Sequence, residues 1–116
     1  MIRGGNTTLM VSDFDRAVRF YTDILGLKLK NRFANEWAEV ETPGLTIGLH
    51  PSRPGMPAGG ASHISIGLGV EDLDTVMADL RKKGVEFQPI RDAGEAGRFA
   101  SFSDPDGTSL YLHQDG

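Results

Sequence analysis

The sequence LMVSDFD at residues 9–15 returns as LGVEDLD at residues 68–74. In both copies a short apolar stretch, typical of a strand, ends just before an aspartate, and a helical spacing of apolar residues then begins. Asp13 and Asp72 are suited to cap a helix, because a carboxylate accepts the free N–H groups of the first turn. We therefore expect a duplicated unit that starts with a strand and a helix.

Each predicted helix has an apolar stripe and a glycine stop. The stripes repeat at spacings of three, four and seven residues and consist of Phe14, Ala17, Val18, Tyr21 and Leu25 in the first copy and Leu73, Val76, Met77 and Leu80 in the second. Gly26 and Gly84 follow where a left-handed residue commonly ends a helix. The patterns predict one amphipathic helix in each copy.

Three further strands follow each helix. The apolar period changes to two, which predicts second strands from residues 27–30 and 85–88 and third strands at 36–40 and 98–102. Turns rich in Pro, Gly and Asp then lead into fourth strands that end at His50 and His113. We predict an α+β fold of two βαβββ modules, residues 1–50 and 62–116, joined by a linker at 51–61 that is rich in Pro and Gly. The two sheets are expected to form an incomplete barrel with the helices outside, so that the uncovered faces line a cavity.

Composition limits the function. The 116 residues are 39% hydrophobic and carry a formal net charge of −4, which argues against nucleic acid and anionic membranes as partners. The absence of cysteine excludes a disulfide framework, a thiolate nucleophile and a cysteine-ligated metal. No apolar stretch has the character of a signal peptide or the length of a membrane span. A cytoplasmic location is the default expectation.

Two motifs resemble a known superfamily. VSDFDRAVRFY at residues 11–21, running on to LGL at 25–27, and FSDPDG at 102–107 resemble the vicinal oxygen chelate superfamily, which includes glyoxalase I, bleomycin-resistance proteins, fosfomycin-resistance proteins and extradiol dioxygenases. The resemblance covers nearly the whole chain. It implies the incomplete barrel described above, but it does not specify the activity, because different sites are built on the same fold.

The metal ligands of that superfamily are missing here. The resemblance implies one ligand (His, Glu or Gln) from the first and fourth strand of each module, and these positions hold Asn6, Gly48, Ser65 and Tyr111. Such a set is not suited to a first-row metal ion, so we predict no metal and no other cofactor. The three histidines, His50, His63 and His113, each lie two residues from such a position. They are expected at the rim of the cavity, and their convergence on a divalent metal is the alternative.

The third strands place aromatic side chains on the cavity face. Since Ala38 and Val40 are expected in the core, Trp37 and Glu39 project the other way, and Phe99 and Ser101 do so in the second module. The rings would form a stacking wall for a ligand or, alternatively, a subunit contact or barrel filling. Glu39 is a candidate base with a raised pKa, or else a solvated strand glutamate. Thr8 and Met10 continue this face.

These observations lead to two functional hypotheses. The first is a homodimer that binds a small, partly aromatic or oxygen-rich molecule in a metal-free cavity, for resistance, carriage or sensing. The residues expected to contact this ligand are Asn6, Thr8, Met10, Trp37, Glu39, His50, His63, Ser65, Phe99, Ser101, Tyr111 and His113. The alternative is an enzyme of the same superfamily, a lyase, isomerase or dioxygenase that uses a metal or Glu39 with a histidine.

Overall fold

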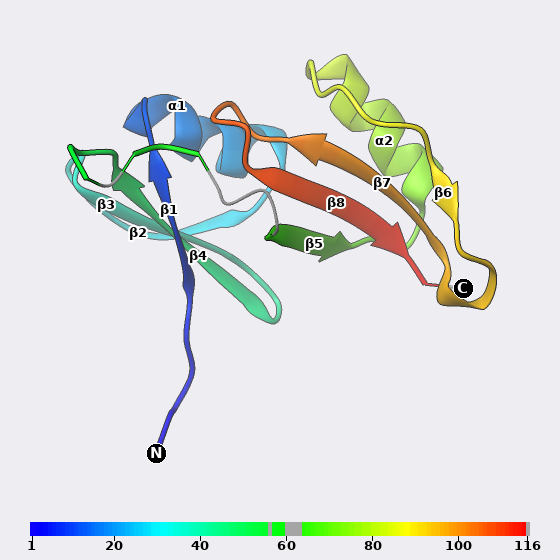
Figure 1. Ribbon diagram of the computed structural model, residues 1–116, viewed down its shortest axis with the longest axis horizontal. Helices are drawn as coiled ribbons and strands as arrows, with labels where there is room; N and C mark the ends of the chain where they lie inside the picture. The colour runs from blue at the N-terminus through cyan, green and yellow to red at the C-terminus, as the bar shows by residue number, and fades with distance from the viewer. Residues whose placement is uncertain (56, 60–63, 116) are drawn as a thin grey trace. The chain divides into compact units, whose positions relative to one another are not determined.

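Two compact units make up the chain, Met1–Gly60 and Ala61–Gly116. The computed structural model describes residues 1–55, 57–59 and 64–115. Each unit contains one four-stranded sheet and one α-helix (Figure 1). We call them unit 1 and unit 2 and describe each by itself.

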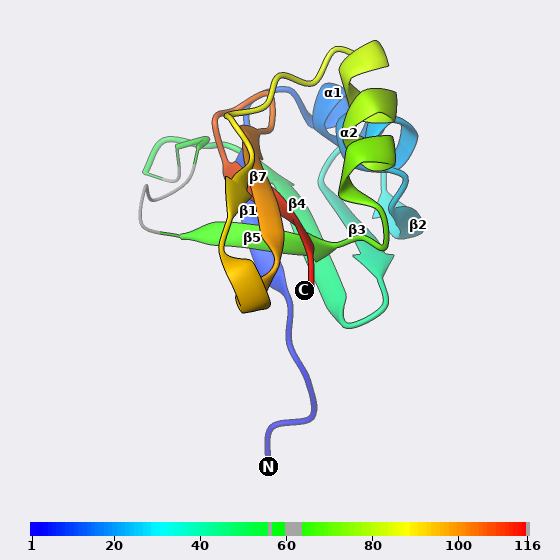
Figure 2. The same ribbon diagram turned by 90° about the vertical axis from the view of Figure 1, so that its right-hand side faces the viewer.

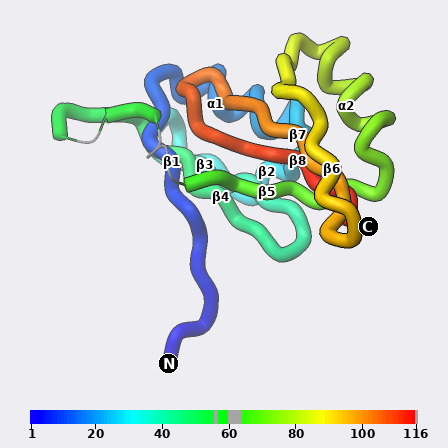
Figure 3. The backbone as a smooth tube through the Cα atoms, turned by 45° about the vertical axis from the view of Figure 1, so that its right-hand side comes forward, coloured from blue at the N-terminus to red at the C-terminus, as the bar shows by residue number. Residues whose placement is uncertain are grey.

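Unit 1 has a mixed sheet with the strand order β1-β4-β3-β2. Its elements in chain order are β1 (Thr7–Val11), α1 (Phe14–Arg19), η1 (Phe20–Ile24), β2 (Lys28–Phe33), β3 (Trp37–Thr42) and β4 (Leu45–Pro51). β1 is parallel to β4, and the other pairs are antiparallel. The segment before β1 extends away from the sheet of this unit (Figure 3).

Unit 2 repeats this topology with the order β5-β8-β7-β6. Its elements are β5 (Ser65–Gly69), α2 (Leu73–Lys82), β6 (Arg91–Asp92), η2 (Gly94–Ala96), β7 (Arg98–Ser103) and β8 (Ser109–Gln114). β5 is parallel to β8, as β1 is to β4. The predicted α+β fold of two βαβββ modules is therefore confirmed.

The predicted helix signals act as expected. An oxygen of Asp13 accepts the N–H of Arg16 at 3.1 Å, and one of Asp72 accepts the N–H of Thr75 at 3.2 Å. Gly26 and Gly84 end the helical segments with φ of 80° and 95°, a left-handed conformation in which only glycine is free of strain. These local interactions determine where each helix begins and ends.

Each helix packs on one face of its own sheet. α1 contacts β4 and α2 contacts β8, and Figure 2 shows α2 along the sheet of its unit. The buried side chains of these faces are Val11, Ala38, Val40, Ile47 and Leu49 in unit 1 and Ala100, Phe102, Leu110 and Leu112 in unit 2. They meet Phe14, Ala17, Val18 and Tyr21 from the first helix and Leu73, Met77 and Leu80 from the second. Leu25 and Val76, predicted as core, are only half-buried.

The first helix differs from a regular α-helix in its second half. After Arg19 it widens into the π-helical turn η1, and both Phe20 and Tyr21 are buried with their rings 5.2 Å apart. Phe20 is absent from the predicted stripe. A π-turn adds one residue to a turn, which changes the face that later residues present, and Leu25 accordingly leaves the core.

The strand predicted at residues 85–88 is wrong. One bond, from the N–H of Gln88 to the carbonyl of Ser101 at 2.9 Å, joins this segment to β7, and the paired strand β6 begins only at Arg91. Pro89 follows directly and has no N–H to donate to a ladder.

Within the described residues, no helix is long and apolar enough to cross a membrane.

Candidate functional site

Each sheet has one face that its helix does not cover, which we call the open face of the unit. In unit 1, register places Thr8 beside Gly48, Gly48 beside Glu39, and Glu39 beside Asn31. Residues paired across strands point to the same face, and these alternate with the buried set of the core. Met10 and His50 pair next to this row, and Trp37 lies two residues from Glu39 on the same face. Five predicted binding residues, Thr8, Met10, Trp37, Glu39 and His50, thus share the open face of unit 1.

Trp37 occupies the space above Gly48. A Cβ atom built on Gly48 would lie 2.9 Å from Cζ2 of the indole and closer still to its outer carbon Cη2. Side chains larger than glycine would therefore collide with the ring. The indole N–H points the other way and donates to Oε1 of Glu39 at 3.1 Å. The ring is held between a glycine and a carboxylate.

The carboxylate of Glu39 is the centre of a small polar cluster. Besides the Trp37 donor, Nδ2 of Asn31 donates to Oε1 at 3.3 Å, and Nζ of Lys30 lies 3.9 Å from Oε2. The Trp37 hydrogen bond, followed by that of Asn31, lowers the pKa of Glu39 below 4.5, and Lys30 contributes in the same direction. The expectation of a raised pKa for Glu39 is wrong. Burial alone would raise the pKa, but the hydrogen bonds from Trp37 and Asn31 stabilise the charged form and outweigh it. Glu39 is therefore ionised at neutral pH.

Asn31 and Lys30 were missed by the sequence reasoning. The strand β2 has a register shift between Leu29 and Asn31, so simple alternation from residue 27 does not assign their faces. A cross-strand pairing of β2 with β3 would have found them. The amide oxygen of Asn31 is buried and has no hydrogen-bond partner among the described residues.

The remaining predicted residues of unit 1 have local partners. Nδ1 of His50 lies 2.7 Å from the carbonyl of Pro51, and the hydroxyl of Thr8 donates to the amide oxygen of Asn6 at 3.3 Å. Asn6 precedes β1 and is exposed.

A separate hollow of about 540 Å³ lies at the β3–β4 turn. Its walls are Gly5, Lys28 and residues 41–46, and none of the predicted binding residues lines it.

The open face of unit 2 carries a row of rings. Phe99 pairs with His113, and Tyr111 pairs with Ser101 on one side and Gly67 on the other. The rings of Phe99 and Tyr111 are 6.2 Å apart, and those of Tyr111 and His113 are 5.8 Å apart. Four of the predicted residues, Phe99, Ser101, Tyr111 and His113, thus share one face.

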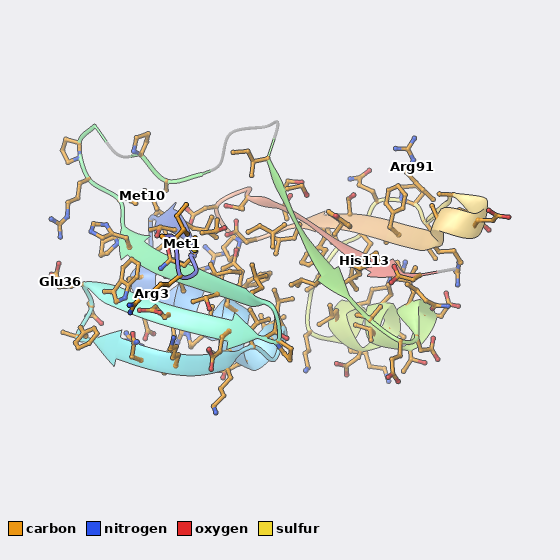
Figure 4. All side chains as sticks on the ribbon, turned by 90° about the horizontal axis from the view of Figure 1, so that it is seen from below. Met1, Arg3, Met10, Glu36, Arg91 and His113 are labelled. Carbon is orange, nitrogen blue, oxygen red and sulfur yellow. The ribbon has the colours of Figure 1, made fainter. Side chains whose placement is uncertain are left out.

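Three polar residues lie at the ends of this group of rings. The guanidinium of Arg91, not predicted as part of the site, lies 5.9 Å from the centre of the Phe99 ring. At the opposite end of the face, the hydroxyls of Ser65 and Ser109 are 3.0 Å apart. Figure 4 shows Met10 on β1 of unit 1, and Arg91 and His113 in unit 2. His63, another predicted contact, lies outside the described residues.

The four positions at which the superfamily places metal ligands do not fit a metal ion. Gly48 has no side chain, and its space is filled by Trp37. The Tyr111 ring covers Gly67, since a Cβ there would lie 2.8 Å from Cε2 of the ring. The amide of Asn6 and the hydroxyl of Ser65 are neutral groups and are weak ligands for a first-row metal ion. Among the described residues no group of three His, Asp or Glu side chains could hold a metal ion.

The sequence and the fold match known proteins. Residues 5–112 match the profile of the Glyoxalase/Bleomycin resistance protein/Dioxygenase superfamily. The chain therefore belongs to this superfamily, as the sequence motifs predicted. It is 29% identical to the uncharacterized protein YaeR of Escherichia coli (strain K12), with 91% of each chain covered.

Two solved structures from Streptomyces sp. CB03234 are similar over most of their length. One is TnmS3, described as an antibiotic binding protein, with a TM-score of 0.80, 28% identity and coverage of 100% of this chain and 99% of that one. The other is a glyoxalase/bleomycin resistance protein, with a TM-score of 0.74, 30% identity and coverage of 95% and 100%.

Proposed function

We propose that this protein binds a small, partly aromatic or oxygen-bearing molecule on its open sheet faces and does so without a metal ion. The observation that carries this proposal is the placement of aromatic rings on the faces that the helices leave uncovered: Trp37 in unit 1, and Phe99 and Tyr111 in unit 2. Rings held in this way offer a planar ligand a large contact area at little entropic cost. The likeness to TnmS3, an antibiotic binding protein, supports a binding role.

The polar residues of the open faces would give the ligand its orientation. In this proposal the Asn6 amide of unit 1 bonds oxygen atoms of a ligand whose ring stacks on Trp37, and the Tyr111 hydroxyl of unit 2 bonds those of a ligand whose ring stacks on Phe99. The other contacts proposed are Thr8, Met10, Glu39 and His50 in unit 1 and His63, Ser65, Ser101 and His113 in unit 2. Met10 adds an adaptable apolar contact.

Assembly as a homodimer is part of the proposal. Both sheets have open edge strands among the described residues, β1 and β2 in unit 1 and β5 and β6 in unit 2, and such edges favour pairing. Light scattering at micromolar concentration is expected to give twice the mass of one chain. A monomer at that concentration would contradict this part of the proposal but not ligand binding itself.

Replacement of Tyr111 tests the binding role. Tyr111→Phe keeps the ring and removes the hydroxyl, so affinity for an oxygen-bearing aromatic ligand is expected to fall by about 1 kcal/mol, an ordinary hydrogen bond. Calorimetric titration measures the affinity, and an unchanged unfolding midpoint shows that the fold is intact. If no aromatic ligand from a broad panel binds the wild type, the proposed function is wrong.

Metal content is tested separately. We expect protein purified without added metal or affinity tag to hold no stoichiometric zinc, nickel, manganese or iron by elemental analysis. A stoichiometric ion that survives dialysis and disappears in a His63→Ala variant would overturn the metal-free proposal.

A further inference from the structure

The two oxygens of the Glu39 carboxylate differ in their partners. Oε1 accepts hydrogen bonds from both Trp37 and Asn31, at 3.1 and 3.3 Å. Among the described residues, the one partner of Oε2 is the Lys30 ammonium at 3.9 Å, which is beyond hydrogen-bond distance. The Lys30 side chain is about half exposed, against 20% for that of Glu39, so this contact is a loose surface ion pair of small energy. One oxygen of an ionised carboxylate therefore lacks a close donor.

A second acceptor in the same cluster also lacks a donor. The amide of Asn31 gives its N–H to Glu39, and its buried Oδ1 has no partner among the described residues. Asn31 and Glu39 are neighbours across β2 and β3. Because Oδ1 of Asn31 is buried, a ligand on the open face does not reach it. The cluster thus offers a ligand negative charge and one accessible acceptor, Oε2 of Glu39.

An aromatic ring lies directly beside the Glu39 carboxylate. The Trp37 indole is fixed at its N–H by Glu39 and faces Gly48 at its outer edge. The face of an indole is the best aromatic partner for a cation. A flat, apolar ring and a negative carboxylate therefore lie next to each other on the open face of unit 1.

We propose that the group seated on unit 1 is a planar ring that carries a protonated nitrogen. The ring stacks on Trp37, and the nitrogen donates to Oε2 of Glu39, displacing the Lys30 ammonium. The inference rests on the proposed function and deepens it, because it names the charge of the ligand. An anionic ring would meet the ionised carboxylate, and a neutral ring would leave Oε2 without a close donor.

The test uses two probes with the same ring and opposite charge. These are 2-(aminomethyl)naphthalene, a cation at neutral pH, and 2-naphthoate, an anion. Trp37 is the only tryptophan, so its indole N–H gives a single resonance that reports binding at this site. We expect the cation to shift this resonance and to bind about tenfold more tightly than the anion, as expected for a charge-assisted hydrogen bond.

Three variants separate the site from general electrostatics. Glu39→Gln keeps an acceptor for Trp37 and Asn31 but removes the charge, and it should weaken cation binding about tenfold. Glu41→Gln removes the same charge two residues along β3 and should leave binding within about twofold, as expected for a screened surface charge. Lys30→Met removes the competing ammonium and should strengthen cation binding.

The outcomes distinguish this inference from the proposed function. If both probes shift the Trp37 resonance with equal affinity, or Glu39→Gln and Glu41→Gln weaken binding equally, the inference is wrong and the binding function stands. A larger loss in Glu41→Gln than in Glu39→Gln would place the probe in the hollow at the β3–β4 turn and would also overturn the inference. If neither probe binds at millimolar concentration, both this inference and the proposed binding on Trp37 are contradicted.

Discussion

The two units have the same topology but differently equipped open faces. In unit 1 the Trp37 indole is hydrogen-bonded to an ionised carboxylate, and Phe33 is its cross-strand neighbour. Unit 2 has three rings in a row, with the Arg91 guanidinium against the last one. The helix-covered faces, by contrast, hold the same kind of aliphatic and aromatic side chains. Folding therefore constrains one face of each sheet, and the other face is free to differ.

The glycine and its covering ring lie on different strands in the two units. In unit 1 the glycine, Gly48, is on β4 and the covering ring is on β3. In unit 2 the ring, Tyr111, is on β8, the counterpart of β4, and it covers Gly67 on β5, the counterpart of β1. Each unit thus has a glycine beneath a ring, but on a different pair of strands. The following predictions test how far the two units are equivalent.

The largest effect is expected from equivalent core leucines. Leu49 on β4 and Leu112 on β8 are both buried, so Leu49→Ala and Leu112→Ala should each lower the free energy of unfolding by about 3 kcal/mol. Urea denaturation measures the loss. Leu29→Ala, at a side chain with 42% exposure, is the matched control and should cost far less. A cost below about 1 kcal/mol at only one of the two core positions would show that the units are not equivalent in packing.

Substitution beneath the rings should have a smaller and unequal effect. Gly48→Ala forces the hydrogen-bonded Trp37 ring to move, and we expect a loss of about 2 kcal/mol from overpacking. Gly67→Ala meets only the phenol end of Tyr111, which can swing away, so a loss of about 1 kcal/mol is expected. Gly5→Ala, with no atom within 4 Å of the added carbon, is the control. Equal losses at both positions would contradict the view that the Glu39 bond holds the indole rigidly.

The helix caps should differ only slightly. Asp13→Ala is expected to cost about 1 kcal/mol of unfolding free energy. Asp72→Ala should cost somewhat more, because Asp72 also accepts the hydroxyl of Thr75 at 2.8 Å. Thermal unfolding with the exposed Glu86→Ala as a charge-matched control measures both. Equal costs at the two caps would mean that the Thr75 bond contributes nothing.

The smallest effect concerns the pH dependence of stability. The folded pKa of Glu39 is lowered below 4.5 by its donors, so its contribution to stability is present above the unfolded value and is lost as pH falls through the lowered folded value. The difference in unfolding free energy between the wild type and Glu39→Gln should be constant above pH 5 and shrink toward pH 3. A difference that grows on acidification would mean that the pKa is raised.

Much of the fold could be predicted from the sequence because its signals are local. Asp13 and Asp72 cap their helices through bonds to residues three positions away, and Gly26 and Gly84 end them through their own backbone angles. The alternation of Ala38 and Val40 with Trp37 and Glu39 likewise predicted which face each side chain takes. Two predictions were wrong where another local feature intervened. The π-turn after Arg19 changed the buried face of the first helix, and Pro89 follows the segment 85–88, where a strand was expected.

The candidate site was predictable only as a set of residues on a face. The sequence by itself determined the duplicated modules, their helices and the two sheet faces, since each depends on residue type and spacing along the chain. Only the tertiary structure decided that Trp37 fills the space above Gly48 and that Asn31 and Trp37 lower the pKa of Glu39. The reason is physical: these properties depend on distances between atoms on neighbouring strands. A register shift of one residue in β2, which alternation does not reveal, decides which side chains meet.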